Sequence, residues 1–125
     1  MAELLYKYEA YEIAGAAMDV YHQLGVGFLE PVYQESLAIE LSRRNIPFQR
    51  EAPFSIFYKG HELNKKYIAD FICCEAIVVE LKALPRISNI EVAQLINYLK
   101  VTRNRVGMLI NFGSRPRMEW KRFVI

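Results

Sequence analysis

The chain has 125 residues, of which 53% are hydrophobic and 24% charged, a balance typical of one compact globular domain. Its 16 Lys and Arg against 14 Asp and Glu leave a net charge of +2, too small to indicate nucleic-acid binding by itself. No uncharged stretch is long enough to span a bilayer and no basic-then-apolar signal segment opens the sequence, so we expect a cytoplasmic protein without a membrane partner.

The first third of the sequence predicts two helices. Over residues 3–24 apolar residues recur near helical spacing, and Gly25 is a natural C-terminal stop. A second helix should begin near Glu30, because Pro31 suits the first helical turn, and should end around Arg44. Its apolar faces are expected to be formed by Val32, Leu37, Ile39 and Leu41.

The rest of the chain predicts a sheet and one more helix. Residues 48–84 are rich in β-branched and aromatic residues and favour an antiparallel meander of three strands, with turns at YKGHE and CCEA. A third helix should run from Asn89 to about Thr102, followed by a buried strand in RVGMLINF and an edge strand in RMEWKRFVI. This order predicts an α/β (α+β) fold, a mixed central sheet flanked by helices.

The two cysteines, Cys73 and Cys74, are adjacent in sequence. A disulfide between neighbours is strained, so we expect free thiols in a reducing compartment, at least one of them buried. His22 and His61 are far apart in the sequence and do not complete zinc-ligand spacing with the cysteines, so we expect no structural zinc site.

Three charged residues interrupt the apolar strands of YIADFICCEAIVVELKAL, residues 67–84. Because strand side chains alternate, a three-residue turn centred on Glu75 would place Asp70 directly opposite Glu80. Like charges in cross-strand positions are destabilising unless a proton or a cation lies between them, and carboxylate oxygens are ligands that Mg²⁺ favours. The pattern therefore indicates a metal site beside Lys82; the alternative is a structural ion pair of Lys82 with one of the acids.

Several motifs together resemble one known family. An Asp followed across a hairpin by Glu-x-Lys and then by a helix resembles the core of the PD-(D/E)XK nuclease superfamily, although Ala69 stands where the superfamily name has Pro. Upstream, GFLEPVY resembles the motif that names the GxxExxY family, small bacterial proteins assigned to that superfamily, and GMLINFG and KRFV are also similar to that family. QLINY resembles the Q-x-x-x-Y element of the exonuclease-like branch. The resemblance implies a restriction-endonuclease-like core in a single domain over residues 1–125.

The resemblance also implies a metal centre with a catalytic lysine. Asp70 and Glu80 would ligate Mg²⁺ or Mn²⁺, and Lys82 would be the catalytic lysine. Glu30 would approach the same metal directly or through water; the alternative for Glu30 is a carboxylate favoured by the helix N-terminus. On the sequence alone, Asp70→Asn is expected to stabilise the metal-free protein, because it removes one of two facing charges.

Three further residues are implied as substrate contacts. Gln94 and Tyr98 are spaced to share one face of the third helix, and Gln94 would also take part in catalysis. Tyr33 is a third substrate contact by resemblance. The alternative for both tyrosines is packing against the sheet.

The implied function is metal-dependent hydrolysis of phosphodiester bonds in nucleic acid, with DNA favoured as the partner and no small-molecule cofactor. Basic residues at the ends of the apolar segments would hold backbone phosphates; they are Arg43, Arg44, Lys65, Lys66, Arg103 and Arg105. Two alternatives keep the fold without turnover: a nucleic-acid-binding module and a homodimeric interaction module.

Overall fold

A computed structural model describes residues 4–125 of the chain. Its elements are α1 (Lys7–Leu24), α2 (Glu30–Arg43), β1 (Phe48–Tyr58), β2 (His61–Cys73), β3 (Ile77–Lys82), α3 (Asn89–Thr102), β4 (Val106–Asn111) and β5 (Glu119–Val124). The order of helices and strands is the predicted one. The expected helix start at Glu3 lies outside the described residues, and α1 begins after Tyr6, whose φ of 53° is left-handed.

The five strands form one mixed sheet in the order β1-β2-β3-β4-β5. The first three strands are the predicted antiparallel meander, and α3 then carries the chain to β4, which pairs with β3 in parallel. The last strand, β5, pairs antiparallel with β4 and lies at the sheet edge, as expected. The topology confirms a mixed α+β sheet.

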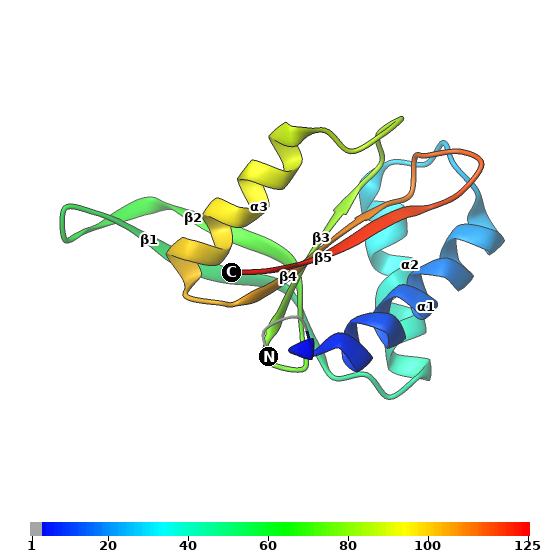
Figure 1. Cartoon of the computed structure of the whole chain (residues 1–125), viewed down its shortest axis with the longest axis horizontal. Coiled ribbons are helices and arrows are strands. Elements are labelled where there is room, and N and C mark those ends of the chain that lie inside the picture. The colour runs from blue at the N-terminus through cyan, green and yellow to red at the C-terminus, as the bar shows by residue number, and fades with distance from the viewer. Residues whose placement is uncertain (1–3) are drawn as a thin grey trace.

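Helices cover both faces of this sheet: α1 and α2 lie together on one face and α3 lies on the other (Figure 1). Strand β3 contributes to both cores, because Val79 packs with α1 and α2 while Val78 packs with α3. Alternation along β3 therefore directs Glu80 and Lys82 toward the α3 side.

Helix α2 buries a narrower stripe than the sequence predicted. Tyr33, Leu37 and Leu41 are fully buried, at a spacing of four residues. Val32 and Ile39 were expected in the same apolar faces, but they are 39% and 57% exposed because they lie off this stripe.

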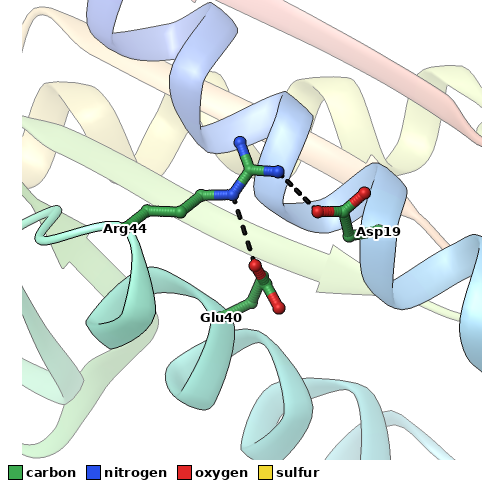
Figure 2. Close-up of polar contacts among 3 residues, drawn as sticks. All are labelled: Asp19, Glu40 and Arg44. Carbon is green, nitrogen blue, oxygen red and sulfur yellow. Dashed lines mark hydrogen bonds and ion pairs between the residues drawn. The ribbon is translucent and has the colours of Figure 1, made fainter.

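The side chain of Arg44 links α1 to α2 (Figure 2). Its Nη2 lies 2.5 Å from Oδ2 of Asp19, and its Nε lies 3.4 Å from Oε2 of Glu40. Arg44 was expected to hold backbone phosphates, but here its charge is compensated by two carboxylates. Exposed ion pairs of this kind contribute only about 0–1 kcal/mol each, so these contacts add little to the stability of the helix pair.

Both cysteines are free, as expected, with Cys73 buried and Cys74 half-buried. Burial raises the pKa of the Cys73 thiol to about 12, which makes it unreactive near neutral pH. Among residues 4–125, no helix combines the length and the apolar character needed to cross a membrane.

Candidate active site

The tight hairpin between β2 and β3 sets the register of the site. Its loop, residues 74–76, contains two non-glycine residues with a φ of 57°, a left-handed conformation that lets the chain reverse without a glycine. The ladder runs to the pair of Phe71 and Val79. The same register places Asp70 opposite Glu80, which agrees with the prediction.

Asp70 lies at the fork where β2 separates from β3. Beyond Phe71 the ladder stops, and the backbone N–H of Leu81 donates instead to Oδ2 of Asp70 at 2.8 Å. The other oxygen, Oδ1, accepts a hydrogen bond from Nε2 of Gln34 at 2.9 Å. Two donors to one carboxylate fix its orientation.

At this fork, β1 and β2 switch which of their two faces is buried against the α1–α2 side and which against the α3 side. Phe71 packs in the core with α1 and α2, whereas Ala69 packs in the core with α3. The β1–β2 ladder skips the pair of Glu51 and Asp70, and Glu51 has a φ of 54°. Local breaks in a ladder are common beside active sites, because they re-aim a side chain.

Gln34 connects Asp70 to β1. Its Oε1 accepts a hydrogen bond from Nε of Arg50 at 2.8 Å, while its Nε2 donates to Asp70. Because an arginine side chain has donors and no acceptor, this contact fixes the direction of the Gln34 amide. Sequence reasoning missed both residues; the available signal was that Gln34 lies four positions after Glu30, on the same face of α2.

Gln34→Met is expected to destabilise the metal-free protein by about 1–2 kcal/mol, because it removes a hydrogen bond to a charged carboxylate with little change in volume. The measurement is urea unfolding in the presence of EDTA. Gln23→Met, an exposed glutamine on α1, is the matched control and should unfold like the wild type. Equal stability of the two variants would show that Gln34 does not hold Asp70.

Glu80 is held from the α3 side by an aromatic stack. The hydroxyl of Tyr67 donates to Oε1 of Glu80. The Tyr67 ring stacks on Tyr98 of α3, with centroids 3.7 Å apart, and on Phe54 of β1, with centroids 5.9 Å apart. Tyr98 therefore packs against Tyr67, the residue that orients Glu80. This contact agrees with the alternative that Tyr98 packs against the sheet.

The electrostatics of the carboxylate pair favour a proton or a cation between its members. Burial in the first place, together with the charge of Asp70, raises the pKa of Glu80 to about 8, against the lowering effects of the Tyr67 hydroxyl and Lys82. Burial and then the charge of Glu80 raise the pKa of Tyr67, so its hydroxyl stays protonated as a donor.

Lys82 is half-buried on the same face of β3 as Glu80. Within residues 4–125 it forms no hydrogen bond and no ion pair, so the structural ion pair considered as an alternative is not formed. Hydrogen bonds to Ser88 lower the pKa of Glu91, and the charge of Lys82 lowers it a little more. Among the described residues, the ammonium group thus has no carboxylate partner and is free to bind a ligand.

Glu30 and Gln94 remain at the surface. Glu30 is exposed at the start of α2, one turn before Gln34, so it shares the helix face that contacts Asp70. Gln94 is exposed on α3, one turn before Tyr98. The structure brings together Asp70, Glu80 and Lys82, and leaves Glu30 and Gln94 without a direct contact to them.

Tyr33 is fully buried and packs its ring parallel to that of Phe112, with centroids 4.5 Å apart. Its hydroxyl donates to the carbonyl of Gly25 at 2.6 Å and accepts from the N–H of Phe28 at 3.3 Å. These contacts favour the packing alternative for Tyr33: it holds the loop that leads into α2 and thereby positions Glu30.

The donor set suits a hard divalent cation. Residues 4–125 contain no group of three or more His, Cys, Asp or Glu side chains arranged to hold a metal, so the expected trio with Glu30 is not assembled. The remaining pair, Asp70 and Glu80, offers oxygen atoms alone, and Mg²⁺ is commonly held by one or two carboxylates and several waters. The repulsion within the pair supplies a physical reason for a cation there.

A hollow of about 400 Å³ lies elsewhere, along β1 and the β2–β3 turn, and includes none of these residues. Its lining is formed by residues such as Phe48, Ala52, Phe54 and Ile72. The charged groups, rather than this hollow, mark the candidate site, because positioned charges can hold a cation and stabilise charge that develops in a reaction.

Comparison with known proteins relates most of the chain to one superfamily. A sequence model described as PD-(D/E)XK nuclease superfamily matches residues 7–123. The crystal structure of SSO0001 has a TM-score of 0.58 to this chain at 21% sequence identity, which shows a shared fold. The alignment covers 97% of this chain and 60% of SSO0001, so the chain spans only part of that protein's length. No curated protein matches the chain.

Proposed function

The chain belongs to the PD-(D/E)XK nuclease superfamily, and on this premise we propose that it is a divalent-metal-dependent nuclease that hydrolyses phosphodiester bonds in nucleic acid, with DNA favoured. One observation carries the proposal. Asp70 stands opposite Glu80 at the fork of β2 and β3, and an unpaired Lys82 follows on the same face. Two carboxylates and a lysine at this spacing are the parts that such a reaction needs.

Asp70 and Glu80 would hold Mg²⁺ or Mn²⁺, with Glu30 reaching it directly or through water. A bound ion of this kind would lower the pKa of a water molecule and stabilise charge on the phosphoryl oxygens. Gln34 and the Leu81 amide keep the Asp70 carboxylate in place, so little reorganisation is needed on binding.

Lys82 would donate to a phosphate oxygen or orient the attacking water, because its ammonium has no partner among residues 4–125. Gln94 would contact the phosphodiester from α3, where its amide is exposed beside Tyr98. We keep Tyr98 as a second contact through its hydroxyl, while the burial of Tyr33 supports a positioning role.

The finer parts of the proposal have separate support. Gly27, Glu30 and Tyr33 support assignment to the GxxExxY family, and the single sheet formed by all five strands supports one domain over residues 1–125. A location in the reducing cytoplasm is supported by the free thiols of Cys73 and Cys74.

A metal titration tests the site without knowledge of the substrate. By calorimetry, Mn²⁺ and Mg²⁺ are expected to bind the wild type, and Asp70→Asn should abolish the binding because one of the two ligands is removed. Asp19→Asn is the matched control, since Asp19 lies away from the site in an ion pair with Arg44. The absence of binding to the wild type at millimolar metal would rule out autonomous catalysis.

A further inference from the structure

The β1–β2 hairpin projects beyond the rest of the sheet, and its tip points away from α1 and α2 (Figure 1). β1 and β2 have 11 and 13 residues, whereas β3 has 6 and pairs only with residues 71–73 of β2, so no described residue forms a third strand beside the distal part of the hairpin. We refer to this part, residues 53–67, as the hairpin arm. An isolated two-stranded ribbon is marginally stable in water, which makes a purely structural role for the tip a weak explanation.

Large aromatic side chains are exposed at the tip of the arm. Phe57 is 62% exposed and Tyr58 is 61% exposed. The ammonium of Lys59 lies 5.5 Å from the centroid of the Tyr58 ring. Aromatic rings next to cationic side chains are typical of surfaces that bind single-stranded nucleic acid, where bases stack on the rings and cations hold the phosphates.

The arm also leads directly to the candidate site. Tyr67 and Phe54 pack toward α3, so Ile68 and Lys66 lie on the opposite face, where Ile68 is 50% exposed. Ile68 is two residues from Asp70 on the same strand. This face leads along β2 toward Asp70, whereas Lys65 lies on the α3 side of the strand, the side of Glu80 and Lys82.

The charge of the arm complements phosphates. Its distal segment, residues 57–66, carries three lysines and one acid, Glu62. Lys66 pairs with this acid, with 3.1 Å between Nζ and Oε2, so the excess positive charge is that of Lys59 and Lys65.

We propose that the hairpin arm binds a single-stranded segment of the polynucleotide substrate, with unpaired bases stacked on Phe57 and Tyr58 and phosphates held by Lys59 and Lys65. This inference rests on the proposed nuclease function and adds a substrate class to it: strands with unpaired bases, rather than continuous duplex. Single-stranded DNA and single-stranded RNA both present unpaired bases and backbone phosphates.

Fluorescence anisotropy in EDTA, where no cleavage occurs, tests the proposal with three labelled probes: oligothymidylate, oligouridylate and a blunt DNA duplex. Phe57→Ala and Tyr58→Ala should each weaken binding of the single strands about tenfold and binding of the duplex much less. Lys59→Gln with Lys65→Gln should lower the slope of log affinity against log salt by about 0.7 for each phosphate that is no longer neutralised. The affinities for oligothymidylate and oligouridylate show whether the arm binds single-stranded DNA or RNA more tightly.

Matched controls lie on other elements: Tyr8→Ala on α1, where the ring is 74% exposed, and Lys100→Gln on α3. These should bind like the wild type. If the arm variants bind the single strands like the wild type, the arm proposal is wrong and the nuclease proposal is unaffected. The same conclusion follows if the variants lose equal affinity for duplex and single strand. A wild type that binds no probe also overturns it, and the metal titration then decides the proposed function separately.

Discussion

Lys82→Met should reduce cleavage of nucleic acid at least about a hundredfold while leaving Mn²⁺ binding intact. Within the described part of the chain the ammonium of Lys82 has no ion pair, and it lies on the face of Glu80, whose pKa it lowers. A group in this position acts on the reacting phosphate rather than on the metal, and removal of such a donor typically costs a factor of about 10²–10³. Single-turnover rates with Mn²⁺ measure the loss of activity, and calorimetry measures the binding.

The control is Lys121→Met, which removes a lysine from the exposed edge strand β5. Lys121 lies over the Phe123 ring, 5.4 Å from its centroid, on a different part of the sheet. Cleavage by this variant should match the wild type. If Lys82→Met also cleaves at the wild-type rate, Lys82 has no part in the reaction, even if the carboxylate pair holds a metal.

The fold was largely predictable because its signals are local. Gly25 ends α1, and the boundaries of α3 at Asn89 and Thr102 follow from a contiguous apolar stripe. The apolar faces of α2 were only partly predictable. Periodicity identifies apolar residues, but which of them are buried depends on how the helix docks, and Val32 and Ile39 remained at the surface.

The charged residues of the site were predictable for a related reason. The positions of Asp70 and Glu80 depend on one turn and on strand alternation, both of which the sequence encodes within a short segment. Gln34 and Tyr67 were not found, because their contacts depend on tertiary packing. Gln34 is 36 positions from Asp70 in sequence, and nothing local in α2 indicates that its amide meets β2.

The structure also changes the expected effect of Asp70→Asn on stability. The expectation from sequence rests on the repulsion between facing charges, which this substitution relieves. Both Asp70 oxygens, however, accept hydrogen bonds, from Leu81 and Gln34. The amide nitrogen of an asparagine would face one of these donors, so the substitution exchanges repulsion for a buried mismatch. A substitution at Glu80 relieves the same repulsion between the two carboxylates without creating such a mismatch.

Glu80→Gln should stabilise the metal-free protein near pH 8 and flatten its pH dependence. Folding raises the pKa of Glu80 from 4.5 to about 8, so between these values the folded protein retains a proton that the unfolded chain has released. The stability of the wild type is therefore highest below the unfolded pKa and falls as pH rises toward 8. A fall of several kcal/mol is expected across this range, since one pKa unit corresponds to about 1.4 kcal/mol.

Glutamine resembles the protonated acid, since its amide can donate to Asp70 and accept from the Tyr67 hydroxyl. Urea unfolding in EDTA between about pH 5 and pH 8 measures the slope. The control is Glu35→Gln on the exposed side of α2, which should keep the wild-type slope. Added Mn²⁺ should restore stability to the wild type at pH 8, because a cation then replaces the proton, and should leave Glu80→Gln unchanged. Parallel pH curves for wild type and Glu80→Gln would mean that Glu80 does not share a proton or a cation with Asp70.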